Sequence, residues 1–229
     1  MKKLISLLLA LAMMSACFTA VAEGLTLDKI VDEPIDIVEM PKKDLSEDKA
    51  AHSSDKVTRK DGFVSVTLEN GLTLSMDIPQ NVYTLTQNYL LDIDLYSAVF
   101  SDPTSTLQHF IEKKMHLNMF TFGQDNFDTY VYVYEKDSIG AYIINANDMT
   151  EDDANMIAQY LDSQTGLTFK YGKLGDQIWF MADNIANGKN IVFFTWANGC
   201  MIKAIADVTS SAQGENALAA LAALKISAN

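Results

Sequence analysis

Positively charged residues are scarce in this chain of 229 residues, and arginine is almost absent. The chain has 17 lysine and arginine residues and 30 aspartate and glutamate residues, which gives a formal net charge of −13. Its single arginine is Arg59. Arginine is the usual side chain for bidentate contacts with phosphate, and nucleic-acid binding needs a basic surface. The composition therefore argues against nucleic acids, nucleotides and anionic lipid headgroups as partners, and it favours neutral or cationic ones.

Cysteine is also rare, since the chain has only Cys17 and Cys200. Cys17 lies in the apolar N-terminal segment, so removal of that segment would leave Cys200 alone and no disulfide could form within the chain. Cys200 lies in an apolar, strand-like run with no base or cation next to it in the sequence. This setting predicts a buried and unreactive thiol.

Long apolar runs are missing after the first 22 residues, which predict a signal peptide. Lys2 and Lys3 form a basic start, residues 4–16 are almost entirely apolar, and Ala20-Val21-Ala22 is a small-x-small cleavage pattern. The apolar core is shorter than the ~20 residues that a membrane-spanning helix needs. We therefore expect cleavage after Ala22 and a secreted or extracytoplasmic protein.

Cys17 leaves an alternative open. Met14-Ser15-Ala16-Cys17 resembles the lipoprotein signal, in which the cysteine is acylated and becomes the new N-terminus. The residues after Cys17 stay apolar, whereas lipoproteins usually turn polar at this point, so cleavage after Ala22 is preferred. Association with a membrane is expected only if Cys17 is acylated.

The rest of the chain divides into a tether and one domain. Residues 23–61 predict a flexible acidic tether, because residues 42–61 are dense in charge and serine and offer little to bury. Residues 62–229 are expected to form a single domain. The hydrophobic fraction of the chain, 48%, is sufficient for a core of that size.

Turn and capping signals predict an α+β domain with a mainly antiparallel sheet. Asn70-Gly71 and Asn198-Gly199 are typical of tight hairpins, and four strands are expected between residues 168 and 208. Residues 81–100 give no clear pattern. About three helices should pack on the sheet, and they are expected to start at the capping residues Asp102, Thr150 and Ser210.

The order of the expected strands and helices resembles that of a known group of domains. An opening hairpin ends in Ile78-Pro79 and is followed by Val82-Tyr83-Thr84, with a helix cap at Asp102-Pro103 and a final strand-turn-strand-helix. This order resembles the PsbP/Mog1-like group of α+β domains and exported proteins of Gram-positive bacteria, over roughly residues 62–226. The resemblance implies a binding, chaperone-like or accessory module more than an enzyme, and it carries over no catalytic residue.

The best candidate for a metal site is the set of His109, Glu112 and His116. At spacings of i, i+3 and i+7 they would share one face of the first expected helix, where imidazole and carboxylate groups could hold Zn²⁺. The two-turn span is long for a tetrahedral site, and the solvated side of an amphipathic helix is the alternative interpretation. Asp125 with Asp128 lacks the pattern of a helical calcium loop. No cofactor is predicted.

Catalytic motifs are missing as well. The chain has no Gly-x-Ser-x-Gly and no phosphate-binding glycine loop. Paired carboxylates stay open as a hypothesis, because their separation is a three-dimensional property.

Aromatic residues supply the predicted binding surface. Tyr130, Tyr132 and Tyr134 alternate along one strand and would form a platform for a sugar or a peptide if that face is exposed. Trp179 and Phe193 are expected in the core. The sequence thus favours an exported, non-catalytic binding or interaction module whose partner is an extracytoplasmic protein, peptide or glycan. The alternatives are an extracellular hydrolase that cleaves a polymer through unidentified carboxylates, and a lipid-anchored envelope lipoprotein.

Overall fold

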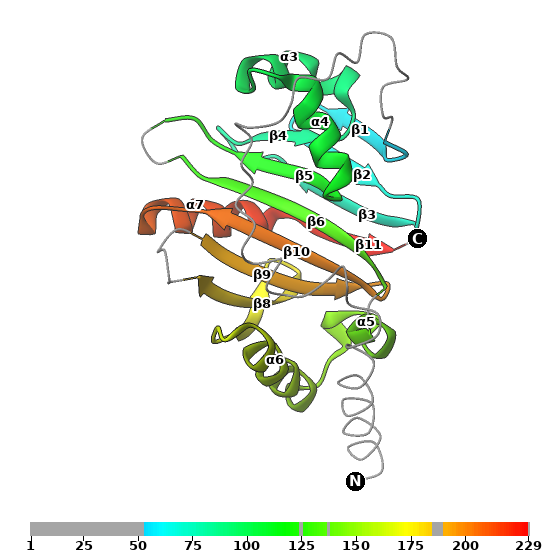
Figure 1. Ribbon diagram of the computed structural model, residues 1–229, viewed down its shortest axis with the longest axis vertical. Coiled ribbons are helices and arrows are strands. Elements are labelled where there is room, and N and C mark those ends of the chain that lie inside the picture. The colour runs from blue at the N-terminus through cyan, green and yellow to red at the C-terminus, as the bar shows by residue number, and fades with distance from the viewer. Residues whose placement is uncertain (1–52, 124–125, 137, 185–189, 229) are drawn as a thin grey trace. The chain divides into compact units, whose positions relative to one another are not determined.

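The computed structural model describes residues 53–123, 126–136, 138–184 and 190–228 (Figure 1). All of them belong to one compact unit, Ile37–Asn229. The expected signal peptide, with Cys17 and Ala22, and the tether up to residue 52 lie outside the described residues.

A four-stranded antiparallel sheet forms one layer of this unit, in the order β1-β2-β3-β11. Its strands are β1 (Lys56–Lys60), β2 (Phe63–Thr67), β3 (Leu72–Asp77) and β11 (Lys225–Ala228). Gly71, which ends the turn between β2 and β3, has φ 82°, a value that glycine adopts without strain. The Asn70-Gly71 hairpin expected from the sequence is therefore confirmed.

A seven-stranded antiparallel sheet forms the second layer, in the order β4-β5-β6-β10-β9-β8-β7. Every neighbouring pair is antiparallel, and the Asn198-Gly199 turn between β9 and β10 has positive φ at both residues, as a tight hairpin requires. The strands are β4 (Tyr83–Thr86), β5 (Met115–Phe120), β6 (Asp128–Lys136), β7 (Lys170–Leu174), β8 (Gln177–Asn184), β9 (Asn190–Ala197) and β10 (Cys200–Asp207).

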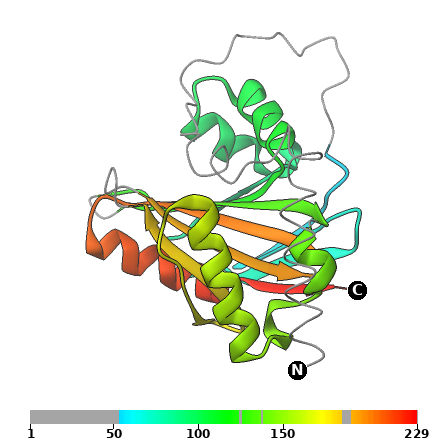
Figure 2. The same ribbon diagram turned by 60° about the horizontal axis from the view of Figure 1, so that its bottom comes forward.

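The hydrophobic core lies between the two sheets. Alternate side chains of β2 and β3 pack against those of β5, β6 and β10, and helix α7 (Ser211–Ala223) closes the same layer with Ala217, Ala220 and Leu221. Trp179 and Phe193 belong to this cluster, as the sequence predicts. Figure 2 shows α7 and the smaller sheet on one face of the seven-stranded sheet, and α3 (Tyr89–Val99) and α4 (Pro103–Glu112) on the other.

The predicted helix starts are confirmed at their caps. Asp102 accepts from Ser105 N at the start of α4, Thr150 and Asp153 form a reciprocal capping box on α6 (Glu151–Thr165), and Ser210 caps α7. Gly166 ends α6 with φ 69°. The chain is therefore an α+β protein with antiparallel sheets.

The described residues hold five α-helices, however, not about three. The two that the sequence analysis missed are α3 and the short α5 (Ser138–Tyr142), which precedes a 3-10 turn, η2 (Ala146–Asp148). In α3 apolar side chains point both inward and outward, since Leu91 and Ile93 are exposed. A helix without one apolar stripe gives no helical period in the sequence.

Strand β1 lies inside residues 23–61, where the sequence predicts a flexible tether. For Lys56–Lys60 that prediction is wrong. Composition misleads here because Val57 packs against the core while the backbone pairing with β2 and the side chain of Arg59, which do not depend on a hydrophobic pattern, also hold β1.

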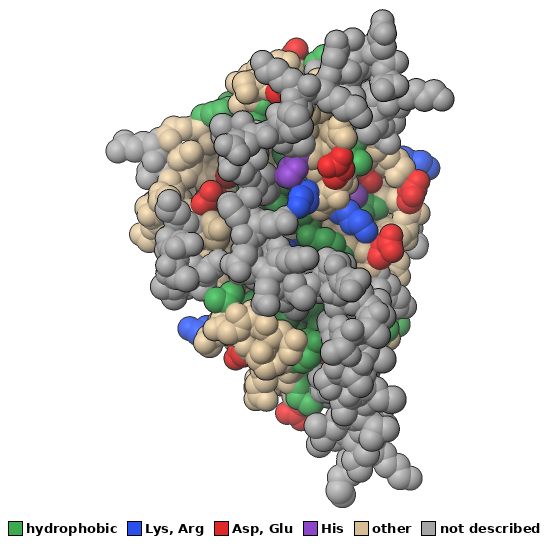
Figure 3. Space-filling model, viewed as in Figure 1, with side chains coloured by type: hydrophobic (Ala, Val, Ile, Leu, Met, Phe, Trp, Pro, Cys, Tyr) green, Lys and Arg blue, Asp and Glu red, His purple; other side chains and the backbone are tan. Residues whose placement is uncertain are grey.

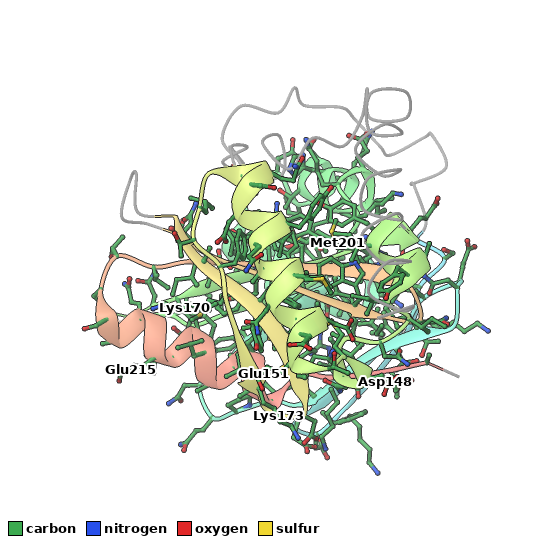
Figure 4. The ribbon with its side chains drawn as sticks, turned by 90° about the horizontal axis from the view of Figure 1, so that it is seen from below. Asp148, Glu151, Lys170, Lys173, Met201 and Glu215 are labelled. Atoms are coloured by element: carbon green, nitrogen blue, oxygen red, sulfur yellow. The ribbon has the colours of Figure 1, made fainter. Side chains whose placement is uncertain are left out.

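Strand β7 forms one edge of the larger sheet. Its lysines, Lys170 and Lys173, are both exposed on the strand at the sheet's edge (Figure 4). Lysines on an edge strand oppose pairing with the edge of another molecule. This side of the sheet is therefore unsuited to binding an added strand.

Candidate functional site

The predicted metal site does not assemble. His109 and Glu112 lie on α4, which ends at Glu112, whereas His116 lies on β5. Lys114 has φ 58°, a left-handed conformation that ends the helical path between them, so the prediction of one shared helix face is wrong. His116 Nδ1 lies 2.6 Å from Oδ2 of Asp55 instead. Within the described ranges no three His, Cys, Asp or Glu side chains form a group that could hold a metal ion.

The three tyrosines of β6 share one face, as predicted, but two of them are buried. Tyr130 is 9% exposed and Tyr132 is 5% exposed, and Tyr134 is half-buried. The rings of Tyr132 and Tyr134 stack with centroids 6.3 Å apart, and Lys203 Nζ lies 5.4 Å from the centroid of Tyr132. These contacts make the middle of the strand part of a packed layer, so Tyr130 and Tyr132 do not form the open platform that was predicted.

An exposed group of aromatic rings lies at the end of the same sheet face. We call Tyr83, Phe120 and Phe122 the aromatic corner. Phe122 is 59% exposed and Tyr83 is 43% exposed, whereas Phe120 is buried behind them. The three ring centroids lie 5.0 to 5.8 Å apart, with Phe122 edge-on to both of the other rings. Such offset and edge-to-face contacts hold the exposed rings in a fixed arrangement.

Asp128 lies next to this corner and has an unusual environment for a carboxylate. Its Oδ1 accepts a hydrogen bond from Asn118 Nδ2 at 2.5 Å, and its Oδ2 accepts one from the Tyr130 hydroxyl at 2.5 Å. Burial, with a smaller contribution from the charge of Asp207, raises the pKa of Asp128 to about 6. Burial and the nearby Asp128 charge also raise the pKa of Tyr130. Hydrogen-bond donors hold this carboxylate, and among the described residues the groups that favour its ionised form are neutral.

Backbone register places these groups in one row across four strands. Tyr83 pairs with Phe120, Phe120 with Asp128, and Asp128 with Asp207. Residues directly opposite each other on antiparallel strands project to the same face. The row therefore runs from two aromatic rings, Tyr83 and Phe120, to two carboxylates, and it shares its face with the three tyrosines of β6.

Sequence reasoning missed this row for two reasons. Tyr83 falls in the segment that gives no clear pattern, and nothing in the sequence around Phe120 and Phe122 indicates that their rings lie beside Tyr83. One signal was present: Asp128 continues the alternation of Tyr130, Tyr132 and Tyr134, so a carboxylate on the tyrosine face could have been inferred.

A second polar network surrounds the only arginine. Arg59 Nη2 lies 2.8 Å from Oδ1 of Asp92, and its Nη1 donates to Thr84 Oγ1 at 2.7 Å. The other oxygen of Asp92 accepts from the backbone N and the hydroxyl of Thr86. The described contacts of this buried carboxylate all lie within the fold, so the network ties β1, β4 and α3 together.

Residues 53–59 are held to the α3–α4 side of the molecule at two further points. Ser53 Oγ donates to Oε1 of Gln87 at 2.5 Å, and Asp55 pairs with His116. We call Ser53, Asp55 and Arg59 the N-terminal clasp. Because β1 pairs with the smaller sheet while the clasp contacts β4, β5 and α3, this short segment links the two layers.

Cys200 is buried on β10 and its sulfur accepts a hydrogen bond from Asn70 Nδ2 at 3.2 Å. This agrees with the predicted buried thiol. In the described ranges, no helix combines the length and the hydrophobicity that crossing a membrane demands. On the face drawn in Figure 3, acidic and basic side chains of the described residues lie interspersed.

Comparisons with protein-family models, with curated proteins and with solved structures find no significant match to this chain.

Proposed function

We propose that this chain is an exported, non-catalytic binding module that works outside the cytoplasmic membrane, with the aromatic corner as its contact surface. The observation that carries the proposal is the exposure of two neighbouring rings, Tyr83 and Phe122, which a third ring holds in place. Exposed apolar side chains that form one continuous patch often mark a binding site. Aromatic side chains also contribute much of the binding energy at protein interfaces. The resemblance to PsbP/Mog1-like modules supports the same kind of function.

The experiment compares single alanine variants in binding screens against peptides, proteins and glycans of the cell envelope. Phe122→Ala and Tyr83→Ala should abolish or strongly weaken binding while leaving the melting temperature nearly unchanged, because both side chains are largely exposed. Ile144→Ala is the matched control, since Ile144 is 57% exposed but lies outside the corner. Binding that survives both corner variants would contradict the proposal.

The expected localisation has its own test. The intact mass of the exported product should correspond to a chain that starts at Glu23. A product that starts at an acylated Cys17 would instead identify a lipid-anchored envelope lipoprotein, and an uncut chain in the cytosol would contradict export.

An extracellular hydrolase is the second candidate, and Asp128 is the observation that favours it. A carboxyl group whose pKa is raised to about 6, with Asp207 opposite it on β10, is suited to general acid catalysis near neutral pH. Turnover of a polymeric substrate that is lost in both Asp128→Asn and Asp207→Asn would establish this function. Asp128 already accepts two hydrogen bonds within the fold, so its carboxyl group is less available to a substrate. This favours the binding function over hydrolysis.

A further inference from the structure

We propose that the aromatic corner and Asp207 together form a binding site for a peptide segment that presents a lysine or arginine side chain beside an apolar one. The proposal rests on the proposed function of the corner as a contact surface, and it adds the chemical class of the ligand.

The rings of the corner touch one another, so they present a surface and enclose no cage. Ring centroids lie 5.8 Å apart for Tyr83 and Phe120, 5.0 Å for Tyr83 and Phe122, and 5.3 Å for Phe120 and Phe122. A cation that is surrounded by rings needs them spread around it, each within about 6 Å of the charge. A ligand therefore lies on the exposed rings of Tyr83 and Phe122, and an apolar or planar group fits there best.

The row next to the corner attracts cations. Asp207 is exposed at the end of β10, and Asp128 lies between it and Phe120. Among the described residues, the groups that favour the ionised form of Asp128 are neutral donors, namely Tyr130, Asn118 and the backbone of Thr129, while Asp207 disfavours it. A cationic group above the row would reduce this repulsion, whereas an anionic one would add to it. The faces of the exposed rings also attract positive charge.

The fold already contains such a contact on the same face, where Lys203 Nζ lies over the ring of Tyr132. Lys203 is four residues from Asp207 along β10, which corresponds to about 13 Å in a strand. A ligand cation at the exposed Asp207 would be in contact with water, and Coulomb repulsion falls with distance. Lys203 therefore repels a ligand cation at Asp207 only weakly.

The spacing suits an extended peptide. The exposed ring of Tyr83 and Asp207 lie on strands three apart, which corresponds to about 14 Å. In an extended chain, residues i and i+2 lie about 7 Å apart on one side, and a lysine or arginine side chain supplies the remaining reach. An apolar residue on the corner and a cationic residue two positions away can thus be bound together.

The test uses the purified full chain and a synthetic blocked peptide that contains phenylalanine and arginine two residues apart. Two matched peptides replace arginine with neutral citrulline or phenylalanine with alanine, and a neutral oligosaccharide is the fourth probe. Binding is followed by NMR chemical-shift titration at low and high salt. Replacing arginine with citrulline, or Asp207→Asn, should weaken binding by about two- to five-fold, and added salt should do the same.

Phe122→Ala should remove most of the binding, and Asp176→Asn, which changes an exposed carboxylate in the turn between β7 and β8, should leave it unchanged. Equal affinity for the arginine and citrulline peptides, or no binding of the arginine peptide, overturns the ligand class. Oligosaccharide binding that requires Phe122 but ignores Asp207 and salt also overturns it, while leaving the corner as a contact surface. Peptide binding that is unchanged in Phe122→Ala overturns both proposals.

Discussion

Arg59 and Asp92 form a buried ion pair between strand β1 and helix α3, with Nη2 of the arginine 2.8 Å from Oδ1 of the aspartate. The side chain of Asp92 is 3% exposed, so Arg59 and the two donors of Thr86 take the place of the water that an exposed carboxylate would contact. The only arginine of the chain thus stabilises the fold, although arginine is better known for contacts with anionic ligands.

Arg59→Met should destabilise the protein by about 2 to 4 kcal/mol, because it leaves a buried carboxylate without its cation. The free energy of unfolding is measured by urea denaturation at neutral pH. Lys60→Met is the control, since Lys60 is exposed on the same strand, and its effect should stay within about 0.5 kcal/mol. If both variants have the same stability, the ion pair has no structural role.

His116→Ala should loosen the N-terminal clasp without unfolding the domain. The substitution removes the partner of Asp55 and leaves that carboxylate without its 2.6 Å contact. Hydrogen exchange of the amides of Ser53–Lys60 should become at least several-fold faster, while exchange in β9 and β10 stays unchanged. Gln108→Ala is the control, because the hydrogen bond from Gln108 to Glu112 lies on the exposed surface of α4. Unchanged exchange at Ser53–Lys60 would contradict the clasp.

Asp128 makes the stability depend on pH. Its pKa rises from 3.8 to about 6 on folding, so the folded chain binds more protons than the unfolded chain between these values. The contribution of this group to the free energy of unfolding therefore falls as the pH rises through this window, by up to about 3 kcal/mol. Asp128→Asn cannot ionise, so its stability relative to the unaltered protein should increase from pH 4 to pH 7.

Denaturation curves at several pH values check this prediction, with Asp176→Asn as the control for removing an exposed carboxylate. A stability difference between Asp128→Asn and the unaltered protein that does not change with pH would show that Asp128 has an ordinary environment.

Gly175→Ala should be strongly destabilising because the turn between β7 and β8 packs against the end of α7. A Cβ at Gly175 would clash with the carbonyl oxygen of Ala222, and φ at this residue is +62°. Gly62 has a similar φ of +72° with no atom within 4 Å of a Cβ, so Gly62→Ala isolates the conformational cost. We expect Gly175→Ala to cost about 1 to 3 kcal/mol more than Gly62→Ala in urea denaturation. Equal costs would mean that the end of α7 moves away from the new Cβ without loss of stability.

Local signals in the sequence predict much of the fold. Caps at Asp102, Thr150 and Ser210 and hairpins at Asn70-Gly71 and Asn198-Gly199 depend on one or two residues each, and all are confirmed. Elements without such signals are missed. Helix α3 has apolar residues on its buried and its exposed side, and β11 pairs with β3, which is far away in the sequence.

The candidate site depends even more on distant pairing. Tyr83, Phe120, Asp128 and Asp207 come from four strands, and only the register of those strands brings them into one row. The predicted metal ligands failed for the opposite reason. His109 and His116 are close in sequence, but one residue with positive φ, Lys114, places them on different elements.

The position of β1 has a practical consequence for recombinant work. A shortened protein that begins at Gly62 would lose β1, and the backbone groups of β2 that pair with it would face solvent. Unpaired strands of this kind join to those of other molecules, so such a protein should aggregate. Beginning at or before Ser53 preserves both the outer strand and its anchors on α3 and β5.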